Sequence, residues 1–119
     1  MDPVFTATVR QSATGPVVGC AGEIDLDGAP RLRAALTTAL AVRPAPAVIV
    51  VDLAAVTFCD SSGLNVLLKS RTEAGRQGTA LHLARPCPQV EELLRITGVG
   101  GIFPVDRDVA ATEPQDPAG

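Results

Sequence analysis

The segment Ala47-Val48-Ile49-Val50-Val51-Asp52-Leu53 decides the fold of this chain. Its apolar residues run almost without interruption and most of them are β-branched, which is typical of a strand that is covered on both faces. A helical pattern precedes the segment and another follows it. We therefore expect a buried central strand in a sheet that has helices packed against it.

The flanking segments predict an alternation of strands and helices. Apolar residues recur at helical spacing in residues 29–42, and a helical period resumes after Ser61 and Ser62 and ends near Gly75. Gly15-Pro16 indicates a turn, so the first two strands are expected to form a hairpin. In chain order, we expect strands at 4–9 and 17–22, a helix at 29–42, the strand at 47–53, a helix at 61–75, a strand at 79–84, a helix at 88–96 and an edge strand at 102–105.

The order ββαβαβαβ predicts an α/β fold with a mixed, mostly parallel β-sheet, because strands joined through helices pair in parallel by right-handed crossovers. A chain of 119 residues has the length of one domain, which we expect to occupy residues 1–106. Residues 107–119 are polar and rich in proline, so a disordered tail is expected there.

Composition argues against several function classes. The hydrophobic fraction is 46%, yet Trp and Tyr are absent and only three Phe are present, so we expect an aliphatic core, and the composition disfavours a surface that stacks bases. The net charge is −3 and the basic residues are scattered, so no direct nucleic acid partner is expected. The sequence lacks a membrane-spanning segment and a secretory signal pattern, and we expect a cytoplasmic protein.

The cysteines predict reduced, structural thiols. Cys20, Cys59 and Cys87 are odd in number and lack C-x-x-C spacing, so neither a disulfide framework nor a zinc site is expected.

Other polar residues do not form a recognisable catalytic or metal site. His82 is the only histidine and lies in an apolar strand, where no Ser-His-Asp set can be argued, so the chain is not expected to be an enzyme. Glu23, Asp25 and Asp27 alternate, but they lack the glycine and terminal glutamate of a calcium loop, and no metal is expected. Gly98-Val99-Gly100-Gly101 follows a helix and ends it, so no cofactor is expected.

The segment Asp60-Ser61-Ser62-Gly63 lies where the second helix begins. Ser61 or Ser62 can cap the free backbone N–H groups of the first turn. A phosphoryl group on one of these hydroxyls would lie near the positive end of the helix and would add about −1.5 to −2 charge at pH 7. The residues alone leave two interpretations open: a helix cap, or a phosphoacceptor that switches binding.

Five segments resemble successive landmarks of the STAS domain, and in particular of its anti-sigma factor antagonist branch. They are Gly22-Glu23-Ile24-Asp25, Ala29-Pro30-Arg31-Leu32, Val51-Asp52-Leu53, Phe58-Cys59-Asp60-Ser61-Ser62-Gly63-Leu64 and Leu94-Arg95-Ile96-Thr97-Gly98. The resemblance spans about residues 4–105, and Asp-Ser-Ser-Gly-Leu is its most specific part.

The resemblance implies a regulator that is switched by phosphorylation. In that family the serine matching Ser61 is phosphorylated by an anti-sigma factor that is also an ATP-dependent serine kinase. The unphosphorylated antagonist sequesters this kinase and frees the sigma factor, and a PP2C-type phosphatase resets the switch. The resemblance also implies a monomer that meets the kinase.

The resemblance further assigns roles to residues near Ser61. Asp60 and Ser62 would help to present Ser61, Gly63 would let the kinase backbone approach, and Asp25 would lie beside the same docking surface. Two positions depart from the family pattern. Asn65 replaces a common glycine and puts the identity of the kinase in doubt, and Cys59, which replaces another apolar residue, is expected to pack in the core.

An alternative function from a different class remains open. A STAS module can serve as a sensing or scaffolding unit that binds a nucleotide, a lipid or a larger signalling assembly and is never phosphorylated. Stabilisation of the folded chain by a small molecule without any kinase would favour this alternative.

Overall fold

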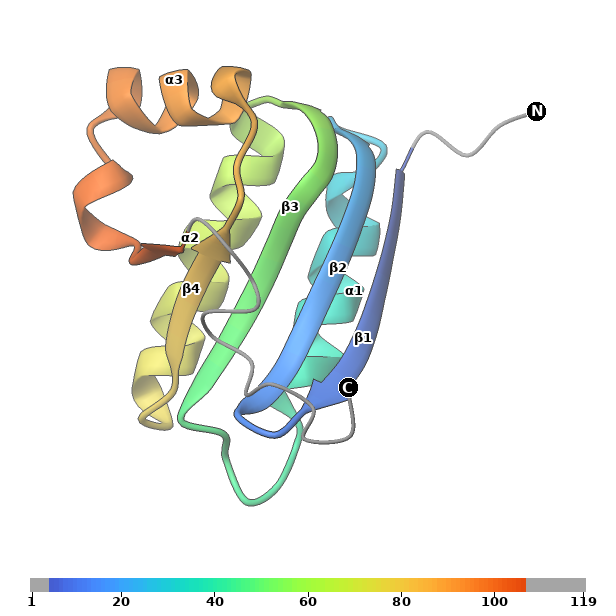
Figure 1. Ribbon diagram of the computed structural model, residues 1–119, viewed down its shortest axis with the longest axis vertical. Coiled ribbons are helices and arrows are strands. Elements are labelled where there is room, and N and C mark those ends of the chain that lie inside the picture. Colours follow the sequence, from blue (N-terminus) through green and yellow to red (C-terminus); the bar gives the residue numbers. More distant parts are fainter. Residues whose placement is uncertain (1–4, 107–119) are drawn as a thin grey trace, which may run out of the picture.

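Five strands form one mixed sheet in which neighbours along the chain are also neighbours in space (Figure 1). The computed structural model describes residues 5–106, so the predicted tail at 107–119 lies outside the described residues. The strands are β1 (Phe5–Ser12), β2 (Gly15–Ile24), β3 (Val48–Cys59), β4 (Ala80–Ala84) and β5 (Val105–Asp106). The helices are α1 (Ala29–Leu40), α2 (Ser61–Arg76) and α3 (Pro88–Thr97), followed by the short 3₁₀ helix η1 (Gly100–Ile102).

The hairpin at the start of the chain is confirmed, but its turn lies earlier than predicted. Ser12 pairs with Gly15, so residues 13–14 make the turn and Gly15-Pro16 belongs to β2. Gly15 has a φ of +136°, and a Cβ there would lie 2.4 Å from the carbonyl oxygen of Val48. The glycine is therefore required by the backbone conformation and by the close approach of the neighbouring chain.

The predicted parallel pairing is confirmed, since β2 with β3, β3 with β4 and β4 with β5 are all parallel. Ile49, Val50 and Val51 are consecutive and buried, so both faces of β3 are covered at its centre. β3 continues to Cys59, well beyond the predicted end at residue 53. Register shifts between β2 and β3 interrupt the alternation of buried and exposed residues in the second half of β3. Because the alternation is broken, the sequence of this half shows no strand pattern.

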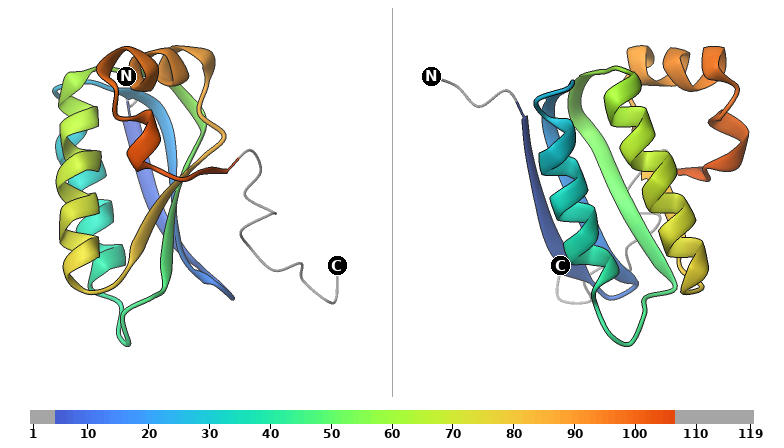
Figure 2. Two further views of the ribbon diagram at one scale, coloured as in Figure 1. Left: turned by 90° about the vertical axis from the view of Figure 1, so that its left-hand side faces the viewer. Right: turned by 180° about the vertical axis from the view of Figure 1, so that it is seen from behind.

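Helices α1 and α2 lie side by side on one face of the sheet, and α3 lies across the end where β2 and β3 terminate, whereas β4 ends earlier, opposite Asp52 of β3 (Figure 2). The aliphatic core fills the space between this face and the helices. A smaller cluster of Val17, Val50 and Ala84 lies apart from that core. The largest fully buried side chains are those of Phe5, Ile24, Leu32, Leu36, Ile49, Leu53, Leu67 and Leu83.

The predicted edge strand at 102–105 is only partly confirmed. Gly100–Ile102 forms η1, and β5 is limited to Val105–Asp106. Pro104 has no N–H to donate to a sheet, but its carbonyl accepts a hydrogen bond from the Leu83 N–H at 2.9 Å. Gly98, which ends α3, has a φ of +76° and confirms the predicted helix stop.

Candidate functional site

The ends of β2 and β3 bring two acidic segments together. The N–H of Asp60, which follows β3, donates to the carbonyl oxygen of Ile24, the last residue of β2, at 3.1 Å. From this point one segment turns into α1 and the other into α2, at the same end of the sheet (Figure 2). Asp25 and Asp60 therefore lie at one edge, the carboxyl ends of parallel strands, where α/β sheets place their binding residues.

Asp60, and not a serine, caps α2. Its carboxylate oxygen Oδ1 accepts a hydrogen bond from the Ser62 N–H at 2.8 Å, and its backbone is extended at φ −109° and ψ −169°. The prediction that Ser61 or Ser62 supplies the cap was wrong. Ser61 is already the first helical residue of α2, so the residue before it, Asp60, occupies the N-cap position.

Ser61 is the first residue of α2, and its side chain is exposed. Among residues 5–106 its hydroxyl makes no side-chain hydrogen bond, and Asp60 supplies the cap in its place. Ser62 is half-buried beside it. A group attached to the Ser61 oxygen would thus project into solvent at the positive end of a helix of 16 residues.

Gly63 has an internal role that the sequence did not predict. It is buried, and a Cβ at this position would lie 2.5 Å from Cγ2 of Ile24 and 2.8 Å from Sγ of Cys59. The close approach that requires glycine is therefore made by the ends of β2 and β3. The expectation that Gly63 admits the backbone of a partner is corrected accordingly, because its Cα faces the core.

The loop after β2 is folded around the carboxylate of Asp25. Oδ1 of Asp25 accepts hydrogen bonds from the N–H groups of Asp27 at 3.1 Å and of Gly28 at 3.0 Å. The carbonyl of Asp25 accepts a third bond from the Ala29 N–H at 2.8 Å. This turn leaves the side chain of Leu26 in solvent, 76% exposed. The sequence analysis did not single out Leu26, although an apolar residue between two aspartates is a detectable signal.

Two further residues lie near Ser61 in the chain. Asn65 is exposed one turn further along α2, where it extends the accessible face of Ser61. Phe58 is 39% exposed and alternates with the buried Cys59, so it faces the side of the sheet away from α2. Of these two residues, only Asn65 therefore shares a face with Ser61.

Gln89 of α3 fixes the end of β3, a contact that the sequence analysis missed. Its Oε1 accepts a hydrogen bond from the Cys59 N–H at 2.9 Å, and its Nε2 donates to the Cys59 carbonyl oxygen at 2.9 Å. The side-chain amide thus acts as one more strand neighbour directly before Asp60 and Ser61. The helical pattern of α3 predicts its apolar face but gives no signal for this amide.

The buried thiols are unreactive by environment. Burial, and then the charge of Asp60, raises the pKa of Cys59 to about 12, and burial followed by the charge of Asp52 raises the pKa of Cys20 to about 12. Both thiols are therefore protonated at neutral pH. The expected core position of Cys59 is confirmed, while Cys87 is half-buried at the start of α3.

The other polar residues considered in the sequence lie apart from this edge or pair locally. His82 is half-buried in the middle of β4 and pairs with Val50. Within residues 5–106 no group of three His, Cys, Asp or Glu side chains is close enough to hold a metal ion. Arg85 makes a two-pronged contact with Asp52, with Nη2 at 2.7 Å from Oδ2 and Nε at 3.3 Å from Oδ1.

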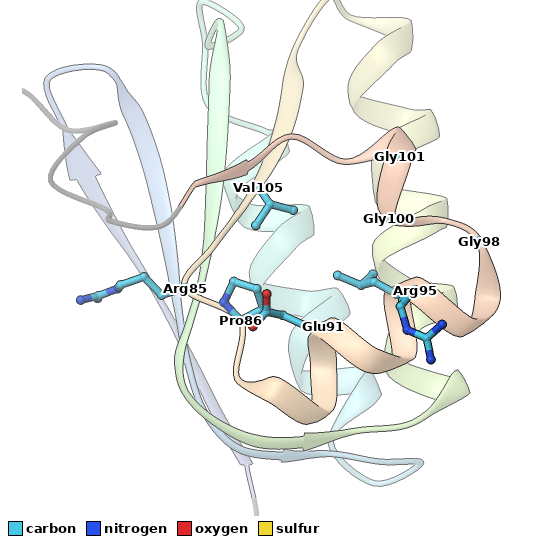
Figure 3. Close-up of a pocket in the computed structure, with 9 residues that line it drawn as sticks. Arg85, Pro86, Glu91, Arg95, Gly98, Gly100, Gly101 and Val105 are labelled. Carbon is cyan, nitrogen blue, oxygen red and sulfur yellow. The ribbon is translucent and has the colours of Figure 1, made fainter.

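A separate pocket of about 730 Å³ lies beneath α3 (Figure 3). Leu94 and Val105 contribute apolar lining, and Glu91 brings a carboxylate. The chain passes Gly98, Gly100 and Gly101 along one wall, and no atom lies within 4 Å of the Cβ position of Gly98 or Gly101. The pocket is an open concave site between α3, the glycine segment that follows it and Val105 of β5, and Ser61 is not among its lining residues.

Comparison with known proteins identifies the family. A family model described as "Mlab, STAS domain" matches residues 7–104. The chain belongs to the STAS domain family. A crystal structure of an anti-sigma factor antagonist from Mycobacterium paratuberculosis is 28% identical, with a TM-score of 0.80 over 91% of this chain and 90% of that one. The unphosphorylated antagonist SpoIIAA is 22% identical, with a TM-score of 0.73 over 89% and 92% of the two chains, and shares the fold.

A curated relative matches only in part. It is a STAS-domain containing protein of Pseudomonas aeruginosa, 38% identical over 56 residues, which are 47% of this chain and 55% of the relative. The aligned region thus spans about half the length of that STAS protein. Within residues 5–106, no helix has the length and apolar character needed to cross a membrane.

Proposed function

We propose that this STAS protein is an anti-sigma factor antagonist whose unphosphorylated form binds an anti-sigma factor serine kinase and so frees a sigma factor. The observation that carries the proposal is the position of Ser61, an exposed hydroxyl at the first residue of α2 that is released from capping by Asp60. The similarity to the mycobacterial antagonist supports the same role.

Phosphorylation of Ser61 would switch the binding off. A kinase can transfer the γ-phosphoryl group of ATP only when the hydroxyl lies in line with it, so in the complex Ser61 must face the phosphates of the nucleotide. A phosphorylated Ser61 would then meet those phosphates with about −1.5 to −2 charge of its own. A PP2C-type phosphatase would restore the binding form. SpoIIAA, which shares the fold, has a structure in its phosphorylated form.

The site needs no chemistry from this chain beyond the hydroxyl. The kinase supplies ATP, Mg²⁺ and the base. This chain is its substrate and also competes with the sigma factor for binding to the kinase. We assign Asp60 and Ser62 to holding the start of α2, and Asp25 and Asn65 to the contact surface. The protein acts in the cytoplasm, binds neither nucleic acid nor membrane, and has no resident cofactor in this proposal.

Binding to the purified anti-sigma factor kinases of the host tests the proposal. Ser61→Ala should bind its cognate kinase as tightly as the unmodified chain and stay bound in the presence of ATP and Mg²⁺. Ser61→Asp should bind at least about tenfold more weakly, because a buried like-charge contact costs more than 1.4 kcal/mol. Ser62→Ala is the matched control and should behave as wild type, because Ser62 holds the start of α2 through its backbone N–H, which alanine keeps. Wild-type affinity of Ser61→Asp would overturn the switch.

A second candidate function is favoured by the pocket beneath α3. Its volume of about 730 Å³ lies in the range of small-molecule sites. In this candidate the chain is a sensing or scaffolding module that responds to a nucleotide or lipid. A thermal shift screen distinguishes the two: a rise in the unfolding temperature with a ligand, without phosphorylation by any kinase, would favour this candidate.

A further inference from the structure

Leu26 is the most exposed large apolar side chain among residues 5–106, at 76%. It lies in the loop that follows β2, at the end of the sheet that also holds Ser61. Ile24, two positions before it, is hydrogen-bonded to Asp60, one position before Ser61. Chain geometry therefore keeps the Cα atoms of Leu26 and Ser61 within about 17 Å of each other, well inside one protein interface.

The loop presents Leu26 in a fixed conformation. Asp25 holds the turn through two hydrogen bonds from the N–H groups of Asp27 and Gly28. Gly28 is buried, and a Cβ there would lie 2.8 Å from the carbonyl oxygen of Glu23 and 3.0 Å from Cβ of Phe5. The loop is thus packed onto the body of the domain. Binding through Leu26 would lose little conformational entropy, because the backbone is already ordered.

Several carboxylates lie at the same end of the sheet as this apolar side chain. Asp25 and Asp27 flank Leu26 in the chain, Glu23 is exposed at the end of β2, and Asp60 follows β3. Arg31, in the first turn of α1, offsets one of these charges. Leu26 with Glu23, Asp25, Asp27 and Asp60 forms a surface patch that has an apolar centre and an acidic rim, which is the usual arrangement of a protein-binding site.

We propose that Leu26 is the apolar anchor of the kinase-binding surface, and that it enters an apolar recess bordered by Lys and Arg side chains on the anti-sigma factor kinase. This inference rests on the proposed function and deepens it. Ser61 faces the nucleotide of the kinase, whereas Leu26 and its carboxylates face the protein. Charge complementarity selects this occupant, because a second copy of the chain would bring the same acidic rim against itself.

The two parts of the patch have separable effects. Burial of Leu26 stabilises the complex once formed, so its loss raises the dissociation rate. The carboxylates attract the partner over a distance, so their loss slows association and weakens its dependence on salt. Asp27→Asn tests the second part, because the Asp27 backbone N–H, and not its side chain, takes part in the turn.

The test compares Leu26→Ser with Ile96→Ser on the cognate kinase. Ile96 is 68% exposed at the far end of α3 from Gln89, so it matches Leu26 in chemistry and exposure but lies outside the patch. Leu26→Ser should weaken binding about tenfold or more, as expected for losing the burial of one leucine, and should raise KM for phosphorylation of Ser61 with kcat within about twofold. Ile96→Ser should bind as wild type.

Circular dichroism spectra and unfolding curves of all variants establish that each is folded. Asp27→Asn should slow association at low salt and leave dissociation unchanged. Equal affinity of Leu26→Ser and wild type for a kinase that phosphorylates Ser61 would overturn this inference and leave the proposed function standing. If the wild-type chain binds none of the kinases of its host, the proposed function fails and this inference fails with it.

Discussion

Substitution of Gly63 by alanine tests the packing beneath the phosphoacceptor. The added methyl group would lie 2.5 Å from Cγ2 of Ile24 and 2.8 Å from Sγ of Cys59. Both neighbours are buried, and Ile24 is β-branched on a strand, so neither can rotate away freely. Overpacking of this kind costs about 1 to 3 kcal/mol. Both approaches are under 3.0 Å, so we take the upper half of this range, about 2 to 3 kcal/mol. The better helix propensity of alanine returns about 1 kcal/mol, which leaves a net loss of about 1 to 2 kcal/mol.

Urea unfolding followed by far-UV circular dichroism measures this loss, since the chain has no Trp or Tyr for fluorescence. With a slope of about 1 to 2 kcal/mol per M, the midpoint should fall by about 1 M. Gly75→Ala is the matched control in the same helix, because its Cβ would enter open space. It should raise stability by about 0.5 kcal/mol. A Gly63→Ala protein as stable as wild type would refute the assigned packing.

Three other predictions concern the frame around Ser61. Asp60→Ala removes the cap of α2 and should cost about 1 kcal/mol in urea unfolding, whereas Asp60→Asn should retain most of it. Gln89→Ala removes two hydrogen bonds to Cys59 and should lower the free energy of unfolding by about 1 to 3 kcal/mol. Gln89→Glu keeps only the acceptor and should have an intermediate stability. Equal stability of wild type, Gln89→Ala and Gln89→Glu would contradict the contact. Because the pKa values of Cys20 and Cys59 are raised to about 12, the folded state keeps two thiol protons that the unfolded state loses above about pH 9. The free energy of unfolding should therefore fall between pH 9 and 12, by about 1.4 kcal/mol per pH unit for each of the two thiols. Replacing Cys20 with alanine should halve this slope in unfolding curves recorded across that range.

The sequence allowed the sheet to be predicted wherever alternation or β-branching was strong. The apolar stretch 47–53 became the centre of β3, and the antiparallel hairpin and parallel pairings follow from the order of elements. The extension of β3 to Cys59 could not be predicted, because register shifts against β2 break the alternation. β5 was misplaced because glycines and Pro104 obscure where a two-residue strand pairs.

The candidate site was predictable at the level of its motif and less so in its detail. The motif placed Ser61 at a helix start, which the structure confirms. The capping residue was missed because the sequence did not show whether the helix begins at Ser61 or one residue later. Position 63 requires glycine because Ile24, far away in the chain, packs against it. The Gln89 contact to Cys59 spans 30 positions. Such contacts depend on tertiary packing and leave no periodic signal in the sequence.

The most direct test of the central claim is mass spectrometry of the intact protein and of its peptides after incubation with ATP, Mg²⁺ and each anti-sigma factor kinase of the host. We predict one added phosphate, on Ser61, with one kinase. A phosphate on Ser62 would keep the switch and correct its site. A folded protein that gains no phosphate with any of these kinases would contradict the account.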